Sequence, residues 1–308
     1  MKNVDKIKEI LEKISFIKKR FQLYCQRVIA PEIIIKIIFY KKLGYRLNLA
    51  NPKTFNEKLQ WLKFNDRNSL YTILVDKYAV KKYVSAKIGE QYIIPTLGVW
   101  SNFDDIDFSK LPNQFVLKCT HDSGSVVVVK DKNSLNMDGA KKVLNRGLSF
   151  NYYYSYYEWP YKNVSPRIIA EKYMLDITEN DFHNNGLTDY KFMCFNGEVR
   201  CIFTCTQRRS NSGLKVTFFD TEWKKMPFER HYPTDKEESI PKPKKFELMK
   251  RLAEKLSVDI PFVRIDFYEI SGKVYFGEVT FFPGAGLEEF KPFKYDYILG
   301  SWLKLHNY

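Results

Sequence analysis

Cysteine and histidine are scarce in this sequence, with five cysteines and four histidines among 308 residues. No Cys-x-x-Cys pair occurs and the number of cysteines is odd, so neither a disulfide framework nor a zinc finger is indicated. Cys201 and Cys205 are four residues apart in a β-like run and would share one face of a strand. We interpret them as small buried apolar side chains in a reducing compartment rather than as a metal site.

Long apolar runs, low-complexity tracts and short-period repeats are also lacking. No segment approaches the roughly 20 apolar residues that a membrane-spanning helix needs. The first twenty residues are rich in Lys and Glu, unlike a secretory signal peptide. We therefore expect a cytoplasmic protein, with peripheral contact at the inner membrane face as a further option.

The sequence is rich in apolar and positively charged side chains. Apolar residues make up 44% of the chain, which is enough for a sizeable core in one large domain or two ordinary ones. The formal net charge is +14, which favours anionic partners such as nucleotides, acidic glycans and anionic lipids. Zinc-finger spacing and RRM-type aromatic motifs are missing, so we do not expect a nucleic-acid partner.

Residues 1–45 stand apart as a basic helical extension. The segment KIKEILEKISFIKKRFQLYCQRVI has apolar residues at helical spacing among many Lys and Arg, and the following APEIIIKIIFYKKLGYRLNL is more apolar. A basic amphipathic helix can lie on an anionic membrane surface. The alternative is a helix packed on the main domain with its lysines in water.

Beyond the extension, the pattern changes from α/β to β-rich. Residues 46–112 alternate short helical and β-like pieces, and Thr54 and Glu57 have the spacing of a capping box at a helix start. Residues 113–308 are mostly β-like, with a hairpin signal at Asn196-Gly197 and one late helix. We expect an α+β fold with an antiparallel sheet at its centre.

The stretch RIDFYEISGKVYFGEVT, residues 264–280, predicts a hairpin around Ser271-Gly272-Lys273. A three-residue turn places Asp266 directly opposite Glu278, although like charges on facing strands repel at about 5 Å. A divalent cation would relieve that repulsion, and Mg²⁺ prefers one or two carboxylates plus phosphate oxygens. Neutralisation by Arg264 and a paired general acid and base are the alternatives.

A second candidate feature is FVLKCTHDSGSVVVVK, residues 115–130. Lys118 stands inside an apolar strand, where an unpaired ammonium group would cost free energy that a bound phosphate would offset. The turn at residues 120–125 offers small side chains and backbone N–H groups that can wrap phosphate oxygens, although the Walker pattern is absent. The alternative for Lys118 is an edge-strand position facing water.

A third candidate feature is RIIAEKYM, residues 167–174. It predicts a short apolar strand that ends in Glu171-Lys172-Tyr173-Met174. Such an ending could form a backbone hinge against the edge of an adenine. An ordinary strand between two domains fits the same pattern.

These three features occur along the chain in an order that resembles the ATP-grasp superfamily. More narrowly, the chain resembles the TupA-like branch, which is found in bacterial surface-polysaccharide and teichuronopeptide gene sets. The resemblance begins at NPKTF, residue 51, and continues to the C-terminus. It is carried by TFNEKLQWLK, DKYAVKKYV, IGEQYIIP, FVLKCTHDSG, DYKFMCFNGE and FVRIDFY…VYFGEVTFFPGAG.

The resemblance implies an ATP-grasp core over residues 113–308, divided near residue 175 into a nucleotide-binding part and a metal and substrate part. It implies ATP and Mg²⁺ as cofactors, with Asp266 and Glu278 as metal ligands. Thr280 stands where many ATP-grasp enzymes have Asn, and is the candidate third ligand. Arg264 would lie beside the transferring phosphoryl group, and with Lys118 is a candidate catalytic residue.

The resemblance also implies a set of contacts with ATP. Lys118 would contact the α- and β-phosphates, and Lys191 would contact a phosphate. A loop of Ser123, Gly124 and Ser125 would close over the triphosphate. The adenine would be surrounded by Glu171, Lys172, Tyr173 and Met174.

Substrate residues are harder to identify from the sequence. Gly284 and Gly286 would let a substrate approach the backbone closely. Arg208 and Arg209 suit bidentate recognition of a carboxylate or phosphate, and the alternative is two arginines facing water. The tyrosine-rich NYYYSYYEWPY, residues 151–161, fits stacking on sugar rings as well as packing beneath a lid.

The activity implied by the resemblance is carboxylate–amine ligation, in which ATP converts a carboxylate to an acyl phosphate and an amine then displaces phosphate. The acceptor would be an acidic surface glycan or its lipid-linked precursor. The intermediate must be kept from water, so we expect a lid, with the loop at residues 120–125 as candidate. Alternatives are a glycan kinase, a glycosyltransferase of polysaccharide biosynthesis, and a non-catalytic membrane- or glycan-binding protein.

Overall fold

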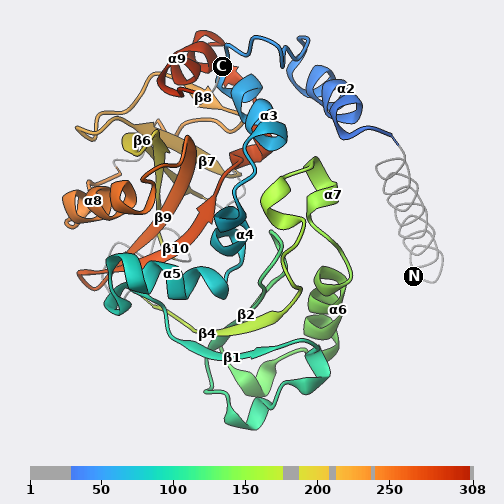
Figure 1. The fold of residues 1–308 in the computed structure, drawn as a ribbon. Helices are drawn as coiled ribbons and strands as arrows, with labels where there is room; N and C mark the ends of the chain where they lie inside the picture. The colour runs from blue at the N-terminus through green and yellow to red at the C-terminus, as the bar shows by residue number, and fades with distance from the viewer. Residues whose placement is uncertain (1–28, 176–186, 208–212, 237–239, 306–308) are drawn as a thin grey trace, which may run out of the picture.

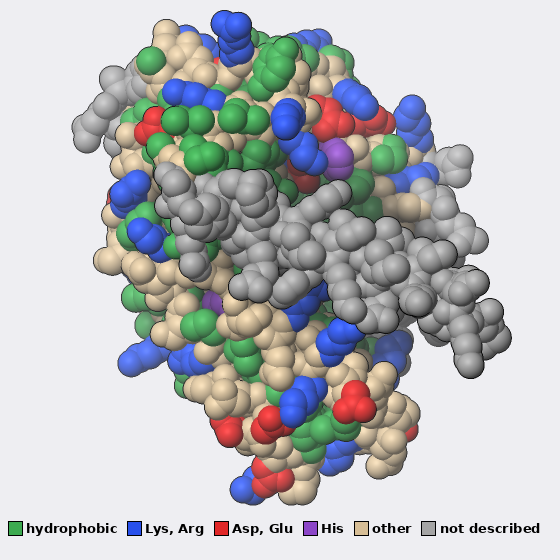
Figure 2. Space-filling model, turned by 90° about the vertical axis from the view of Figure 1, so that its right-hand side faces the viewer, with side chains coloured by type: hydrophobic (Ala, Val, Ile, Leu, Met, Phe, Trp, Pro, Cys, Tyr) green, Lys and Arg blue, Asp and Glu red, His purple; other side chains and the backbone are tan. Residues whose placement is uncertain are grey.

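The computed structural model describes residues 29–175, 187–207, 213–236 and 240–305. Two antiparallel sheets form two lobes, and helices from the first third of the chain lie between and beside them (Figure 1). The mixture of helices and antiparallel sheets confirms the expected α+β class. Lys and Arg side chains are scattered over the face drawn in Figure 2 rather than gathered into a single patch.

The smaller lobe is built on a four-stranded sheet with the order β1-β4-β2-β3. The strands are β1 (Thr96–Trp100), β4 (Ile168–Lys172), β2 (Phe115–Cys119) and β3 (Val126–Val129). One helix, α6 (Met137–Leu148), buries Ala140 and Leu144 against Phe115 and Leu117 of this sheet. The antiparallel β2–β3 pair confirms the apolar strand around Lys118 and the turn predicted at residues 120–125.

The larger lobe is built on a five-stranded sheet with the order β10-β9-β5-β6-β7. The strands are β5 (Asp189–Phe195), β6 (Glu198–Thr206), β7 (Lys215–Phe219), β9 (Phe262–Ile270) and β10 (Lys273–Thr280). The predicted Asn196-Gly197 turn joins β5 to β6, and both residues have the positive φ that a tight hairpin turn requires. The late helix, α8 (Phe246–Leu256), buries Phe246 and Met249 against this sheet.

Residues 46–112 contribute to both lobes. Strand β1 pairs with β4 in the smaller sheet, whereas α3 (Phe55–Asn65), α4 (Ser69–Val75) and α5 (Ala79–Ile88) bury apolar side chains in the core of the larger lobe. The capping box predicted at the start of α3 is present, with both Thr54 and Glu57 side chains bonded to backbone N–H groups.

The remaining helices and strands are α2 (Pro31–Leu43), α7 (Tyr153–Tyr156), α9 (Lys294–Trp302), β8 (Glu229–Arg230) and β11 (Phe290–Lys291). The 3₁₀ turns are η1 (Glu90–Tyr92), η2 (Phe103–Asp105), η3 (Phe108–Lys110), η4 (Lys132–Ser134), η5 (Trp159–Tyr161) and η7 (Pro283–Gly286).

The β9–β10 hairpin differs from the prediction in its turn. Ile270 pairs with Lys273, so the turn has two residues rather than three. The pairing then shifts by one residue, and Thr280 lies opposite Arg264, as a three-residue turn would have placed it. Gly277 occupies the shift, where a Cβ would lie 3.1 Å from the Asp266 carbonyl oxygen. A tight turn followed by a bulge therefore brings Glu278 beside Asp266.

Helix α3 is fastened to α9, which lies more than 200 residues later in the sequence. The backbone N–H and the side-chain amide of Asn56 both donate to the buried carboxylate of Asp296, each at 2.9 Å. Lys58 donates from Nζ to the carbonyl oxygens of Gly300 and Leu303, at 2.8 and 2.6 Å. Helix α3 and the α9 segment thus form one packed unit.

Gly300→Ala is expected to lower the free energy of unfolding by about 1–3 kcal/mol, because overpacking forces a well-packed contact apart. A Cβ at residue 300 would meet the Lys53 carbonyl oxygen and, at 2.8 Å, the Phe55 backbone nitrogen. Urea unfolding of the variant measures the loss. Ser301→Ala, at an exposed position of the same helix, is the control, and equal midpoints for the two variants would contradict the expectation.

The basic extension is described only in part, because residues 1–28 lie outside the described chain. Helix α2 buries Ile35 and Phe39 against Tyr157 and Leu287. On its outer side, Ile33, Ile37 and Tyr40 are between 51% and 56% exposed. Among the described residues, no helix combines the length and apolarity required to cross a membrane.

Candidate active site

A cavity of about 640 Å³ lies between the two sheets and gathers most of the predicted site residues. From the smaller lobe and its connections come Lys118, Ser123, Gly124, Glu171, Lys172, Tyr173 and Met174, and from the larger lobe come Lys191, Asp266 and Glu278. Residues as far apart in the sequence as Lys118 and Glu278 thus share one cavity. We refer to it as the inter-sheet cavity.

Lys118 is held by an ion pair within the smaller sheet. It lies on β2, between β3 and β4, and its Nζ is 2.7 Å from Glu171 Oε2 on β4. Lys81 of α5 pairs with the other oxygen of the same carboxylate. Burial would raise the pKa of Glu171, but the two ammonium groups outweigh it and lower that pKa. Glu171 therefore already offsets the cost of placing Lys118 in an apolar strand, and Lys118 is not on a sheet edge.

The loop at residues 120–125 is anchored on one side and exposed on the other. Thr120, His121 and Asp122 are buried, and Lys77 donates from Nζ to the Asp122 carbonyl oxygen. The Ser125 hydroxyl donates to the Asp122 carboxylate and does not line the inter-sheet cavity. The tip at residues 123–124 is exposed and Ser125 is partly buried, so the tip is the part of this loop that the fold holds least.

Arg264 bridges the two facing carboxylates of the β9–β10 hairpin. Its guanidinium donates to both oxygens of Asp266, at 2.7 and 2.8 Å, and to Glu278 Oε1 at 2.7 Å. Lys191 of β5 pairs with Asp266 and with Asp189. Burial raises the pKa of Asp266, whereas the positive charges of Arg264 and Lys191 outweigh burial at Glu278 and lower its pKa. The alternative in which Arg264 neutralises this pair is thus realised in the structure.

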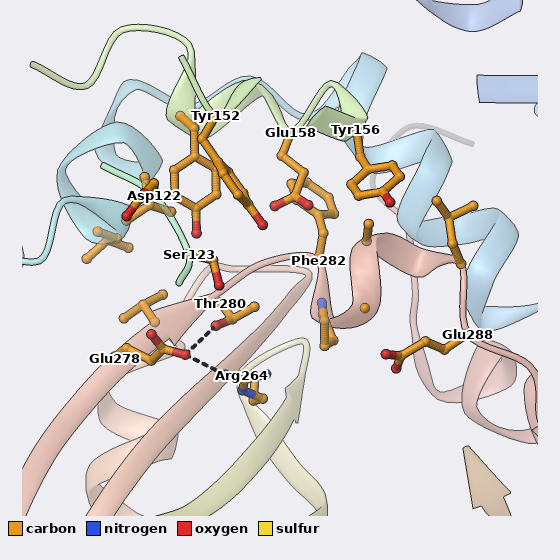
Figure 3. A pocket seen from close by; sticks show the side chains of 18 of the residues that line it. Asp122, Ser123, Tyr152, Tyr156, Glu158, Arg264, Glu278, Thr280, Phe282 and Glu288 are labelled. Atoms are coloured by element: carbon orange, nitrogen blue, oxygen red, sulfur yellow. Dashed lines mark hydrogen bonds and ion pairs between the residues drawn. The ribbon is translucent and has the colours of Figure 1, made fainter. Parts of the chain in front are cut away.

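A second cavity, of about 370 Å³, adjoins the first, and we call it the aromatic cavity. Both cavities are lined by Lys77, Ser123, Gly277 and Glu278. Arg264, Thr280 and Gly284 face the aromatic cavity. Figure 3 shows Tyr152, Glu158 and Tyr156 projecting from the α7 segment toward Ser123, Thr280 and Phe282. Glu278 is therefore placed where a group in either cavity can reach it.

The chain matches the model of the TupA-like ATP-grasp family over residues 57–304. It belongs to this family. Among solved structures it is similar to a D-alanine–D-alanine ligase from Bacillus anthracis complexed with ATP, with 19% identity over 68% of this chain and 53% of that chain and a TM-score of 0.37. No curated protein matches the chain.

Two further ATP-grasp structures show a similar level of likeness. N5-carboxyaminoimidazole synthetase from Staphylococcus aureus is 14% identical over 68% of this chain and 44% of that chain, with a TM-score of 0.39. D-Alanine–D-alanine ligase from Helicobacter pylori is 18% identical over 75% and 63%, with a TM-score of 0.38. The chain thus spans about half the length of the first of the solved structures that it matches.

As an ATP-grasp protein, the chain has ATP and Mg²⁺ as its cofactors, and the inter-sheet cavity fits both. Its walls carry apolar side chains suited to a base, among them Ile94, Val116 and Met174, as well as the ammonium groups of Lys118 and Lys191 suited to phosphates. No group of three or more His, Cys, Asp or Glu able to hold a metal occurs in the described ranges. The predicted ligands are instead two carboxylates and the Thr280 hydroxyl, all hard oxygen donors, which suits Mg²⁺ completed by phosphate oxygens.

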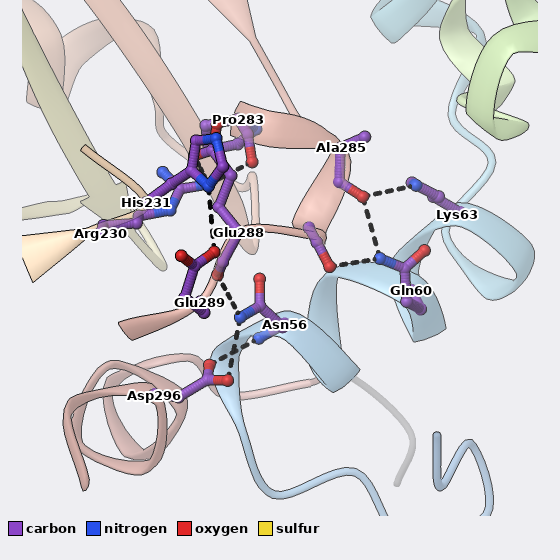
Figure 4. Close-up of polar contacts among 11 residues, drawn as sticks. Asn56, Gln60, Lys63, Arg230, His231, Pro283, Ala285, Glu288, Glu289 and Asp296 are labelled. Carbon is purple, nitrogen blue, oxygen red and sulfur yellow. Dashed lines mark hydrogen bonds and ion pairs between the residues drawn. The ribbon is translucent and has the colours of Figure 1, made fainter. Parts of the chain in front are cut away.

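The loop after β10 forms the floor of the aromatic cavity, and helix α3 fixes its backbone (Figure 4). Gln60 donates from Nε2 to the carbonyl oxygens of Ala285 and Gly286, at 2.9 and 2.8 Å, and Lys63 donates to Ala285 at 2.8 Å. Gly286 is turned away from the cavity, because a Cβ there would meet Gln60 and Leu59. Of the two predicted substrate glycines, only Gly284 lines the cavity.

Glu158 lines the aromatic cavity, and the opposite charge of the buried Lys63 on α3 acts on it. Both are at most 5% exposed. Burial raises the pKa of Glu158 to about 7, partly opposed by the charge of Lys63, and burial lowers the pKa of Lys63 to about 8. The pKa of each group is therefore shifted toward neutral pH relative to a surface group of its type.

This pair predicts a pH-dependent stability. A carboxyl whose pKa is higher in the folded than in the unfolded state binds more protons when folded, so stability falls as the pH rises from about 4.5 to about 7. Lys63, with a lowered pKa, adds stability as the pH rises above about 8. We expect Glu158→Gln to flatten the fall between pH 5 and 7, measured by urea unfolding at pH 5, 6, 7 and 8. Identical profiles for wild type and variant would contradict this assignment.

Several residues of the site were missed from the sequence, and two predicted ones cannot be placed. Arg208 and Arg209 lie outside the described residues. Lys77 and Lys81 belong to the DKYAVKKYV motif, which carried the family resemblance but was given no role. Glu158 lies in the tyrosine-rich run at residues 151–161, for which only the aromatic residues were given a role, in stacking or packing.

Proposed function

We propose that this protein is an ATP- and Mg²⁺-dependent carboxylate–amine ligase that modifies a bacterial surface polysaccharide or its lipid-linked precursor. The observation that carries the proposal is the junction of two cavities at Glu278. One has the apolar and cationic walls suited to a nucleotide, and the other has aromatic and acidic walls suited to further substrates. A ligase needs such a junction, because the activated carboxyl and the amine must meet where the phosphoryl group is transferred.

Within this proposal, ATP supplies a phosphoryl group to the acceptor carboxylate, and Mg²⁺ offsets the charge that develops on the phosphoryl oxygens. Lys118 and Lys191 bind phosphate oxygens from opposite sheets. Arg264 is oriented by Asp266 and faces the aromatic cavity, so it can orient the substrate carboxylate at the transferring group. The tyrosines of the aromatic cavity exclude water from the activated carboxyl.

The ligase proposal is tested by nucleotide consumption across pairs of carboxylic acids and amines, with mass spectrometry of the products. ADP and free phosphate that form only when both an acid and an amine are present support it. ADP with a phosphorylated glycan, and no dependence on an amine, identifies a glycan kinase instead. Hydrolysis of ATP independent of every acid and amine pair would count against both.

We further propose that α2 rests on the anionic lipid surface that presents a lipid-linked substrate. Ile33, Ile37 and Tyr40 recur at helical spacing on its exposed side, and Lys36 and Lys41 provide charges for anionic headgroups. Co-sedimentation with vesicles of equimolar phosphatidylglycerol and phosphatidylcholine tests this. The Ile33→Ser/Ile37→Ser variant is expected to lose most of the binding, whereas Ile73→Ser, an exposed isoleucine on α4, is not. Equal binding by all three proteins would refute the contact.

A further inference from the structure

Glu158 is a buried carboxylate that the ATP-grasp site does not use. It is 5% exposed, lines the aromatic cavity and projects into it in Figure 3. Among the described residues, no side chain or backbone group donates a hydrogen bond to its carboxylate. Lys63, the cation whose charge acts on it, donates instead to the Ala285 carbonyl oxygen. The oxygen atoms of Glu158 are open to the cavity rather than sealed within the protein, so a donor from outside the chain can reach them.

The surroundings of Glu158 fit a cationic donor. Tyr152, Tyr156 and Tyr161 line the same cavity, and the faces of tyrosine rings attract cations. The pKa of Tyr152 is raised mainly by burial and then by the negative charge of Glu158, so this ring stays neutral at physiological pH. A carboxylate among aromatic rings is a favourable site for an ammonium group and a poor one for a second carboxylate.

We propose that Glu158, with Tyr152 and Tyr156, binds the amino group of the amine substrate and takes one of its protons. This inference rests on the proposed ligase function and deepens it, because it names the residue that receives the amine. The cavity is shared with Arg264 and Glu278, which places the amine on the side of the transferring group opposite the nucleotide.

The proton balance of the step follows from this placement. An amine enters as R–NH₃⁺ and gives one proton to the Glu158 carboxylate, so that its nitrogen gains a free electron pair. That nitrogen attacks the carbonyl carbon of the activated carboxyl, the C–N bond forms, and the C–O bond to phosphate breaks with its electron pair leaving on the phosphate. Of the two remaining protons, one goes to the phosphate and one stays on the amide nitrogen.

Binding of defined amines tests the assignment without knowledge of the natural substrate. Saturation-transfer NMR is recorded with ethanolamine, D-glucosamine, L-alanine and L-lysine in the presence of ADP and Mg²⁺. We expect at least one of them to bind the wild type, and Glu158→Gln to weaken that binding at least ten-fold. N-acetyl-D-glucosamine, which lacks the charge, is expected to give no signal. Glu247→Gln, an exposed glutamate of α8 outside the cavity, is the matched control and is expected to bind as the wild type does.

Unchanged amine binding by Glu158→Gln, or no binding of any of the four amines by the wild type, would overturn the proposal. Thermal shift with ATP and Mg²⁺, run on the same proteins, separates this failure from failure of the ligase function. If ATP and Mg²⁺ raise the unfolding temperature but the expected amine binding is not seen, only the role of Glu158 is refuted. If ATP and Mg²⁺ do not raise the unfolding temperature, the proposed ligase function is refuted. Should Glu158→Gln fold poorly because Lys63 loses its partner, Lys63→Met/Glu158→Gln removes both buried charges and carries the same expectation.

Discussion

Replacing Glu278 with Gln is expected to abolish the increase in unfolding temperature that ATP and Mg²⁺ give to the wild type. A ligand at a hundred-fold excess over its Kd stabilises the folded state by about 2.7 kcal/mol, so the shift to be lost is readily measurable. Glu278 is the carboxylate that lines both cavities, and its side chain is 44% exposed, so a metal ion can reach it. Gln keeps the shape but not the charge that a hard cation requires.

Glu247→Gln, on the exposed side of α8, is the control for this change, and we expect it to keep the full shift. Turnover by Glu278→Gln, once an acid and amine pair is known, should fall at least about 100-fold, because charge stabilisation at the transferring group is lost. A Glu278→Gln protein with the wild-type shift would show that the metal is held elsewhere.

Replacing Arg264 with Met is expected to cost about 3–5 kcal/mol of folding free energy, the range seen when one partner of a buried ion pair is removed. Asp266 has a side chain only 2% exposed, and it would keep Lys191 but lose the two hydrogen bonds from Arg264. The like charge of Glu278 beside it would then be opposed by fewer cations. Denaturant unfolding, with the change in midpoint compared at constant slope, measures the loss.

A double variant identifies the cause of that loss. In Arg264→Met/Asp266→Asn the buried charge left without its main partner is itself removed, so we expect a large part of the stability to return. Losses that simply add would show that Arg264 stabilises the fold through packing of its stem rather than through Asp266. Arg264→Lys, which keeps the charge but not the two-pronged geometry, should fall between wild type and Arg264→Met.

Local features of the fold could be predicted from the sequence because their signals are local. The capping box at Thr54 and the turn at Asn196-Gly197 depend on residues within a few positions of each other. The proximity of Asp266 and Glu278 was also predictable, although through the wrong turn. A bulge at Gly277 compensates for the shorter turn. The alternation of apolar and polar residues does not predict such a one-residue shift in strand pairing.

Contacts between distant segments could not be predicted in the same way. Nothing in the apolar strand around Lys118 indicates that Glu171 would neutralise it, because that pairing depends on the order of strands in the sheet. The same is true of Lys63, which is 1% exposed beneath the loop after β10 and donates a hydrogen bond to the Ala285 carbonyl oxygen, more than 200 residues later in the sequence. Buried charges are the residues on which composition and periodicity are least informative, since their partners come from elsewhere in the chain.

The attachment of α3 to the end of the chain has a consequence for dissecting this protein. The core boundaries expected from the sequence would suggest that the strands from residue 113 onward could be expressed alone as a minimal catalytic fragment, whereas the family match begins at residue 57. Such a fragment would lack Gln60 and Lys63, and the carbonyl oxygens of Ala285 and Gly286 would lose their buried donors. It would also lack β1, which leaves the outer edge of β4 open to pairing with other chains. We expect it to aggregate, and any attempt at truncation or domain exchange has to carry the segment from residue 46 along.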